Sequence, residues 1–246
     1  ILLKIEKNTD FKLVQVVIGS KNSSHSNLVE VILGENSNLE HGFISLGDNE
    51  ASLIANLAIT QDIKSNYSLI SIHEGWLFSR FEPHIIQTQG KAKTTLKGLQ
   101  VGNKDQQLST YSNVIFEGPE GELNQLNKAA AKKNSHILFN GQIEVPRIAQ
   151  KTQAAQLSRN LILSKRAQID TKPELKIIAD DVRCTHGATV SQLQEEELFY
   201  LRSRGIGSDQ AYSLLLEGYY KEILSQIPLY STRWKILNNL LSREIE

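Results

Sequence analysis

A cysteine and a histidine two positions apart are the residues of this chain best suited to metal or sulfur chemistry. Cys184 is the only cysteine, and His186 follows it within the run from Ile178 to Val190. Alternate side chains of an extended strand share a face, so we expect both groups on one side, about 7 Å apart. A thiolate and an imidazole together are ligands suited to iron, zinc or sulfur chemistry.

The spacing of this pair leaves two interpretations open. Two ligands do not complete a tetrahedral site, so a metal here would need ligands from elsewhere, including a second chain. Alternatively, Cys184 is a small buried apolar residue and His186 an ordinary hydrogen-bonding one. A single Cys-x-His pair is far less specific than a paired Cys-x-x-Cys framework.

Length and composition restrict the class of protein. The 246 residues can bury a substantial core, and 27 basic and 27 acidic residues give no net formal charge, which argues against nucleic-acid binding. No long apolar run and no charged-then-apolar leader is present, so neither a membrane span nor a signal peptide is expected. A single cysteine cannot form an internal disulfide, so we expect a reducing compartment, the cytoplasm or a plastid stroma. The absence of methionine leads us to expect a truncated or processed product.

Most of the chain reads as short strands separated by polar turns. Runs rich in β-branched and aromatic residues lie at 13–18, 29–33, 43–46, 67–72, 84–88 and 135–139. The turns at 34–38, 47–50, 102–105 and 118–121 contain glycine or asparagine, which we expect to supply positive φ angles. The polar segment 149–160 is expected to interrupt the strands, which resume at 161–163 and 175–179.

Two all-β architectures fit this pattern: a sandwich of hairpins and a parallel β-helix. No helical pattern separates the strands, so a βαβ sheet is unexpected. Two-residue Asn-Gly hairpin loops are missing, which argues against the sandwich. Short strands with recurring corners favour a solenoid, although no strict repeat period is visible. We therefore predict a mainly β protein, with residues 1–190 as a parallel β-helix core.

The character of the chain changes after Ser191, and 191–246 is predicted to be a small C-terminal helical domain. Three glutamates at 195–197 suit the start of a helix, and Gly205 is placed to end it. A second helix is expected from Ser208, as N-cap, to about Ile227. A third is expected from about Leu229, with one apolar face made of Tyr230, Trp234, Leu237 and Leu241.

Longer matches point to a known family. Residues 180–190 read Asp-Asp-Val-Arg-Cys-Thr-His-Gly-Ala-Thr-Val, and 198–206 read Leu-Phe-Tyr-Leu-Arg-Ser-Arg-Gly-Ile. These runs closely resemble the SufB/SufD family of iron–sulfur cluster assembly proteins, and especially its D-type subunit, SufD, which has Cys-Ser-His-Gly-Ala where the B-type paralogue favours His-Glu-Ala. Shorter matches are Gln125–Lys128, Asn134–His136, Phe139–Gly141, Ala149–Thr152 and Asn160–Leu163.

The resemblance covers about 120–220 well and the earlier strands only loosely. Where relatives usually show a His-Thr-x-Pro-His-like segment, this chain has Phe-Glu-Gly-Pro-Glu-Gly at 116–121, so no histidine role is carried over there. We also expect the family's N-terminal helical region to be absent from this sequence, as in a truncated product.

The resemblance implies a right-handed parallel β-helix flanked by helices, working as a non-catalytic scaffold. It implies a complex with a SufB-type paralogue and two copies of a SufC-type ABC ATPase, which would supply the ATPase activity. The Cys-x-His strand would lie near the junction with the SufB-type subunit, with His186 as first and Cys184 as second candidate ligand. A transient iron–sulfur cluster would then be shared with the partner, and this chain alone would hold no cofactor tightly.

The resemblance also places the ATPase contact on the helical tail, from Glu195 to Leu241. A homodimer in isolation is a further possibility, whereas nucleic acid and membrane are not expected partners. Candidate partner-binding residues are Glu195, Phe199, Tyr200, Arg202 and Arg204.

Two other functions stay open. A carbohydrate lyase or glycosidase on a β-helix needs paired carboxylates about 5–10 Å apart. Asp180 and Asp181 do not fit, because adjacent strand residues face opposite sides, and Asp181 is expected to pair with Arg183. The other alternative is a purely structural docking subunit with an inert Cys184.

Several conspicuous residues are expected to have structural roles. His73, His84 and His136 occupy strand or turn contexts without partner spacing. Arg202 and Arg204 are expected to form a solvated helix end, and the apolar stripe around Trp234 to face a core.

Overall fold

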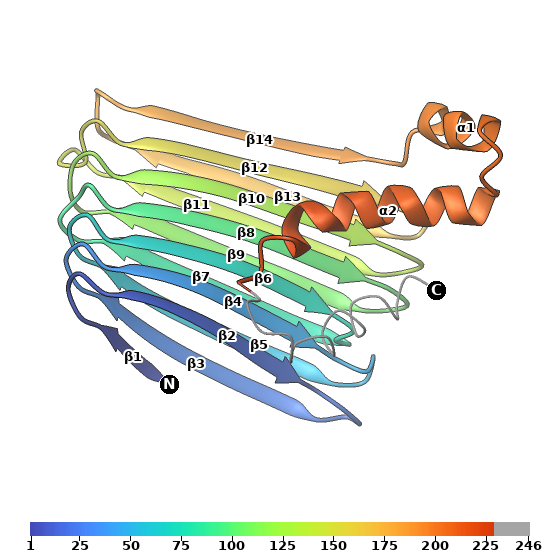
Figure 1. The fold of residues 1–246 in the computed structure, drawn as a ribbon, viewed down its shortest axis with the longest axis horizontal. Coiled ribbons are helices and arrows are strands. Elements are labelled where there is room, and N and C mark those ends of the chain that lie inside the picture. The colour runs from blue at the N-terminus through green and yellow to red at the C-terminus, as the bar shows by residue number, and fades with distance from the viewer. Residues whose placement is uncertain (229–246) are drawn as a thin grey trace.

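A parallel β-helix forms the body of the protein (Figure 1). The computed structural model describes residues 1–228. The strands alternate between two seven-stranded parallel sheets, which we call the odd and even sheets after their strand numbers. The odd sheet contains β1 Leu2–Ile5, β3 Ser24–Leu33, β5 Ser52–Gln61, β7 Phe78–Gln87, β9 Gln107–Phe116, β11 His136–Val145 and β13 Gln168–Ile177. The even sheet contains β2 Asp10–Ile18, β4 Asn38–Leu46, β6 Asn66–Glu74, β8 Lys93–Gly102, β10 Glu122–Ala131, β12 Gln153–Ile162 and β14 Arg183–Ser191.

Successive strands of each sheet pair in register, but the number of residues per turn of the solenoid varies. Ser24 lies opposite Ser52, 28 residues later, and Ser52 lies opposite Phe78, 26 residues later. His136 lies opposite Gln168, 32 residues later. Insertions are absorbed in the turns, which is why the sequence shows strands but no strict period.

Alternation along each strand divides the residues between the interior and the outer surface. On β5 the inward residues Leu53, Ala55, Leu57 and Ile59 are almost fully buried. Equivalent residues of both sheets join one apolar cluster that runs along the solenoid between the two sheets. Each turn of the chain therefore buries its inward side chains on those of its neighbours.

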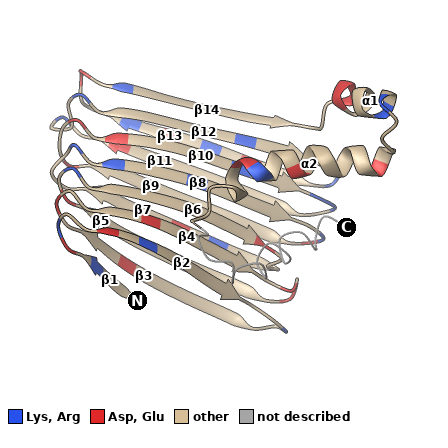
Figure 2. Ribbon diagram, in the orientation of Figure 1, with Lys and Arg blue, Asp and Glu red and all other residues tan. Residues whose placement is uncertain are grey.

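The corners between the sheets correct one expectation about glycine. In the four turns singled out in the sequence, the residues with positive φ are Asn36, Asn49, Lys104 and Glu120, not glycines. Asn49 and Lys104 lie at the edge where even strands lead into odd ones. Asn36 and Glu120 lie at the opposite edge, and their amides donate to the next turn of the chain, to the Ile63 carbonyl at 3.1 Å and the Gln150 carbonyl at 2.8 Å. Figure 2 shows charged residues along this left-hand edge.

The glycines of these corners serve close packing between turns. A Cβ on Gly118 would lie 2.3 Å from the carbonyl carbon of Gln89, and one on Gly47 would lie 2.5 Å from the Gly75 carbonyl oxygen. Only a residue without a side chain fits such an approach.

The polar segment 149–160 was expected to interrupt the strands, and this expectation is wrong. Most of it belongs to β12, whose inward residues Gln156, Ser158 and Asn160 are buried. Their amides and hydroxyls bond inside the solenoid, as in the 2.8 Å hydrogen bond from Gln156 Nε2 to Gln125 Oε1. Polarity concealed the strand because hydrophobic alternation was used to find it.

Two helices follow the last strand. Helix α1 spans Glu195–Ser203, with the three glutamates in its first turn, and Gly205 follows it with a φ of 85°. Helix α2 spans Ser208–Leu224, and its N-cap is Gly207, so Ser208 begins the helix and does not cap it. Neither helix of the described part is long and apolar enough to cross a membrane. The third helix expected from Leu229, including Trp234, lies outside the described residues.

Helix α2 packs lengthwise on the outer face of the even sheet (Figure 1). Its buried face includes Leu216, Tyr220 and Ile223, which join strand residues such as Ile72 and Leu99. Lys128 of β10 lies beneath the helix with a side chain only 3% exposed; its Nζ is 2.5 Å from Glu222 Oε2 and 2.8 Å from the Tyr219 carbonyl oxygen. This buried cation is stabilised by both partners and by the Tyr219 ring, 4.0 Å away.

Two buried histidines make the fold sensitive to acid. Burial lowers the pKa of His41 to about 4 and that of His73 to about 3. Between those values and the unfolded value near 6.5, only the unfolded chain binds the protons, so the free energy of unfolding falls as the pH falls. We expect a loss of about 1.4 kcal/mol per pH unit for each histidine between pH 6 and about 4. Chemical denaturation at a series of pH values measures this slope.

A substitution at His73 isolates its share of that slope. The His73 ring contacts the rings of both Phe43 and Phe81, so His73→Phe keeps an aromatic group there while removing the titration. The slope should decrease by about 1.4 kcal/mol per pH unit. The control Phe43→Leu should lower stability at every pH without changing the slope. An unchanged slope in His73→Phe would contradict the assignment.

Candidate functional site

The Cys-x-His pair lies on the inner face of the last strand of the even sheet. Cys184 is in register with Ala154 and His186 with Gln156, both of which are buried inside the solenoid. The predicted same-face arrangement is therefore present. In residues 1–228 no further strand covers β14, so inward positions that are buried in earlier turns of the solenoid are open here.

Cys184 is only partly accessible. It packs against the edge of the apolar core and is half-buried. Burial raises the pKa of its thiol, and a backbone hydrogen bond at Ala154 opposes this effect. The group is therefore a neutral thiol at neutral pH, and it would have to lose its proton to bind a metal.

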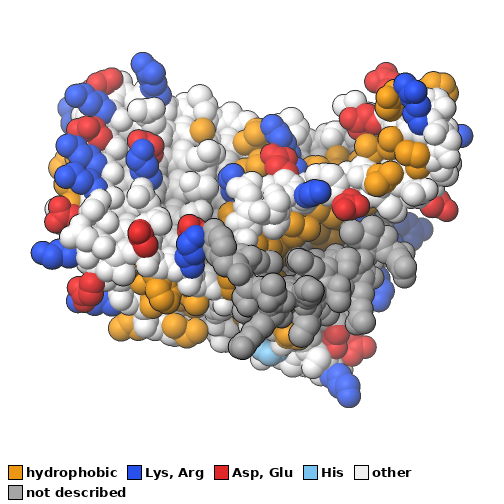
Figure 3. All heavy atoms as spheres, in the orientation of Figure 1, with side chains coloured by type: hydrophobic (Ala, Val, Ile, Leu, Met, Phe, Trp, Pro, Cys, Tyr) orange, Lys and Arg blue, Asp and Glu red, His pale blue; other side chains and the backbone are white. Residues whose placement is uncertain are grey.

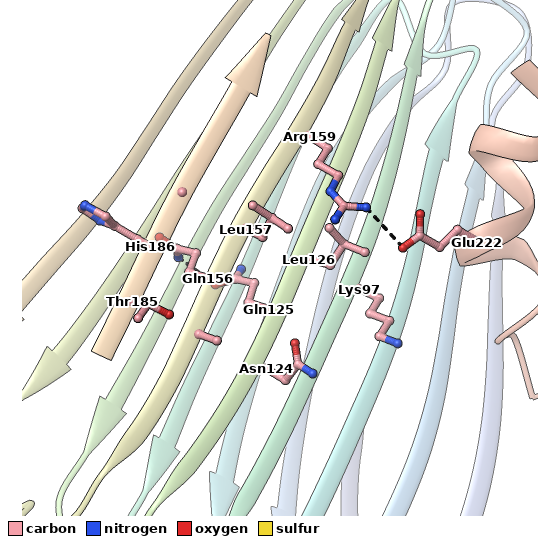
Figure 4. Close-up of a pocket in the computed structure, with 12 residues that line it drawn as sticks. Lys97, Asn124, Gln125, Leu126, Gln156, Leu157, Arg159, Thr185, His186 and Glu222 are labelled. Carbon is pink, nitrogen blue, oxygen red and sulfur yellow. Dashed lines mark hydrogen bonds and ion pairs between the residues drawn. The ribbon is translucent and has the colours of Figure 1, made fainter. Parts of the chain in front are cut away.

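His186 is exposed and borders a hollow of about 480 Å³, which we call the β14 hollow (Figure 4). The hollow extends from β14 across the outer face of the even sheet to the C-terminal part of α2, and its floor includes Leu126 and Leu157. Lys97, Arg159 and Glu222 line its far side.

The charges at that far side are already paired. Glu222 Oε1 lies 3.7 Å from Arg159 Nη1, and the hydrogen bond from Lys128 is the main cause that lowers the pKa of Glu222. Lys97 Nζ donates to Gln226 Oε1 at 2.5 Å. These contacts attach α2 to the sheet, so the groups left to do chemistry are at the β14 side.

The expected pairing of Asp181 with Arg183 is wrong. Asp181 lies in the bend before β14, where strand alternation does not apply, and no ion pair joins the two side chains in the described structure. Its backbone amide instead donates to Gln150 Oε1 at 2.9 Å. Among residues 1–228 no group of three or more His, Cys, Asp or Glu side chains is arranged to hold a metal ion.

The other histidines have the following surroundings. His73 is buried, with Nδ1 2.8 Å from Ser45 Oγ, and His136 Nε2 lies 2.7 Å from Asp170 Oδ2 on the outer surface. His84 borders a shallow hollow on the outer face of the odd sheet, where the single carboxylate is Glu82. Glu82 is itself paired with Arg80, so this hollow lacks the two carboxylates that a glycosidase needs.

All five residues predicted to contact a partner lie on or beside α1 and are exposed. No residue of α1 is buried; Phe199 is 70% and Tyr200 56% exposed. Arg204 stacks over the Tyr200 ring at 5.4 Å. Figure 3 shows hydrophobic side chains on this part of the surface, next to charged ones. Contiguous exposed apolar groups are a common feature of interaction surfaces.

Sequence reasoning missed the polar groups that support β14 from within. Gln125 and Gln156 lie inside the solenoid, below His186. Gln125 belongs to the Gln-Leu-Asn-Lys match, but nothing in a single sequence distinguishes an inward glutamine from an exposed one.

Comparison with known proteins agrees with the sequence resemblance. Residues 1–219 match the family model described as SUF system FeS cluster assembly, SufBD core domain. The chain belongs to the SufBD family. It is therefore a SufBD core, and its parallel β-helix is the fold that the resemblance implied.

Individual relatives agree. The chain is 40% identical over 216 residues to the iron–sulfur cluster assembly SufBD family protein slr0076 of Synechocystis, covering 88% of this chain and 48% of that protein. It is 30% identical to the chloroplastic protein ABCI7 of Arabidopsis thaliana, covering 98% of this chain and 51% of that one. SufD of Escherichia coli is 42% identical over 99 residues, 40% of this chain and 23% of that protein. The chain thus spans about half or less of the length of these curated relatives.

The buried thiol leads to a prediction about reactivity. Because burial raises the pKa of Cys184, iodoacetamide should alkylate the native protein at pH 7 more slowly than the denatured protein. The chain contains no other cysteine, so mass spectrometry reports this thiol alone. A native rate that exceeds the denatured rate would contradict the prediction and would indicate a thiolate paired with protonated His186.

Proposed function

We propose that this chain is a non-catalytic scaffold subunit, of the SufD type, in which His186 and Cys184 supply ligands to an iron–sulfur cluster under assembly. The partner that completes the site is a SufB-type paralogue, and a SufC-type ABC ATPase supplies the energy. Family membership and the open Cys-x-His strand together support this proposal.

The main support for the proposed ligand role is the position of Cys184 and His186 on the last described strand of the even sheet. Two ligands leave an iron site incomplete. β14 also has an unpaired edge on the side away from β12 within the described residues. Such an edge is a natural place for another chain to lie. A partner there would bring its own side chains beside His186 and Cys184.

The neutral thiol of Cys184 suits a cluster that is bound only transiently. A neutral thiol binds metal only with loss of its proton, so affinity depends on what else is bound beside it. The imidazole is exposed, so an incoming ligand set can reach it. We therefore propose that the cluster is shared with the partner and is not held tightly by this chain alone.

The exposed surface of α1 supports the ATPase contact. Because α2 packs on the even sheet and no residue of α1 is buried, α1 is the described helix whose aromatic groups are exposed. Aromatic residues at such a surface commonly dominate binding energy. One relative is described as chloroplastic and another is bacterial, so we propose a plastid stroma or the cytoplasm as the location of this chain.

The ligand role predicts a loss of cluster on substitution. The chain should be expressed with a SufB-type and a SufC-type protein and purified without oxygen. Iron and sulfide content should fall about tenfold or more in His186→Ala and Cys184→Ala. The matched control is Thr185→Ala, because Thr185 lies between the two residues and faces outward.

The result also separates the alternatives. If cluster content is undiminished in both variants while the complex still forms, the ligand role is wrong and Cys184 is inert in a purely docking subunit. If no complex forms with the wild-type chain, the scaffold role itself is wrong.

The helix surface gives a separate prediction. The double variant Phe199→Ala/Tyr200→Ala should weaken binding of the SufC-type ATPase about tenfold or more, as measured by calorimetry. Glu217→Ala, an exposed change on α2, is the control and should bind normally. If the wild type, the double variant and Glu217→Ala bind with equal affinity, the ATPase does not contact Phe199 and Tyr200.

A further inference from the structure

A ladder of buried polar side chains crosses the solenoid interior beneath β14. Gln156 Nε2 donates to Gln125 Oε1 at 2.8 Å, and Gln125 Nε2 donates to Ser112 Oγ at 2.7 Å. All three residues are at most 5% exposed. These hydrogen bonds give each side chain of the ladder a protein partner in place of water, except at the oxygen of Gln156.

That last group is the side-chain carbonyl of Gln156. Its Oε1 is buried and has no hydrogen-bond partner among the described residues. A buried acceptor left without a donor costs about 1–3 kcal/mol, so it calls for an explanation. The surrounding chain makes room for this amide: a Cβ on Gly141 would lie 2.3 Å from Gln156 Nε2.

His186 is the next residue in the same column. It is in register with Gln156 on the neighbouring strand, and both side chains belong to the inner face. Neighbouring strands are about 4.8 Å apart, which is within the reach of a ring nitrogen and an amide oxygen. Figure 4 shows the two residues on neighbouring strands, with the His186 ring directed away from the other labelled side chains. No hydrogen bond is formed by the His186 ring within the described structure.

We propose that Gln156 is a positioning residue for His186. Once the exposed ring turns toward Gln156, the free Oε1 accepts a hydrogen bond from Nδ1–H, which fixes the neutral ring in one tautomer and leaves Nε2 as the ligand atom at the open end. A ring nitrogen that binds metal is normally selected by the hydrogen bond of the other nitrogen. The use of Nε2 as a cluster ligand rests on the proposed function. The proposed hydrogen bond between Gln156 and His186 can be tested without it.

The test is the tautomer of His186 in the protein without iron. Nitrogen-15 NMR of the histidine rings at pH 8 distinguishes Nδ1–H from Nε2–H, and His186→Asn identifies the signal. A net hydrogen bond shifts the ratio of the tautomers by about fivefold. We expect the wild type to favour Nδ1–H, and Gln156→Leu to lose that preference by about this factor.

Two further variants keep the test decisive. Gly141→Ala pushes the Gln156 amide away without removing it, so it should reduce the preference even if Gln156→Leu does not fold. Gln100→Leu is the matched control: Gln100 is also a buried glutamine whose amide has no hydrogen-bond partner in residues 1–228, but it lies on β8, three strands from β14 in the sheet. It should leave the tautomer unchanged.

The outcomes separate this inference from the proposed function. A wild-type ring without a preference for Nδ1–H, or a preference that survives in both Gln156→Leu and Gly141→Ala, overturns the positioning role. A fixed tautomer combined with full cluster content in His186→Ala supports the positioning role and rejects the ligand role.

Discussion

The whole molecule depends on in-register stacking of parallel strands. Each strand of about ten residues pairs with the strand two elements later, so residues roughly thirty positions apart become neighbours. Stacking saturates the backbone hydrogen bonds and joins the inward side chains into columns. One such column runs His41, Leu69, Leu96, Gln125, Gln156 and His186. His186 is exposed because it lies at the end of this column.

The same position has different consequences in the middle and at the end of the solenoid. His41 is covered by neighbouring turns, loses its solvation and stays neutral far below its ordinary pKa. His186 has the equivalent position on the last strand, where no described strand covers it, and it is exposed. Burial therefore distinguishes a structural histidine from a candidate ligand, although both belong to one column.

The outer face follows the same logic. The even sheet would expose residues such as Ile72 and Leu99 without α2, and the helix buries them together with Lys128. This commits α2 to the body and leaves α1 unattached to the sheets, with its aromatic residues in solvent. Of the two described helices, α2 is thus part of the body, whereas α1 keeps its aromatic groups exposed.

Much of this protein was determined by its sequence alone. The β-branched runs predicted the strands, the acidic first turn and Gly205 predicted α1, and the Cys-x-His motif with its flanking runs predicted the family. These features are local, because strand alternation, helix ends and short motifs need only neighbouring residues. Where an expectation failed, as for β12 and Ser208, the local pattern was overridden by burial of polar side chains or by the chain's path.

Only the tertiary structure decided which residues meet. The ladder of Ser112, Gln125 and Gln156 joins three strands, and its register depends on turns of unequal length that no fixed period describes. Lys128 and Glu222 meet across more than ninety residues for the same reason. Hydrogen bonds and burial depend on distance in space, and a single sequence records only distance along the chain.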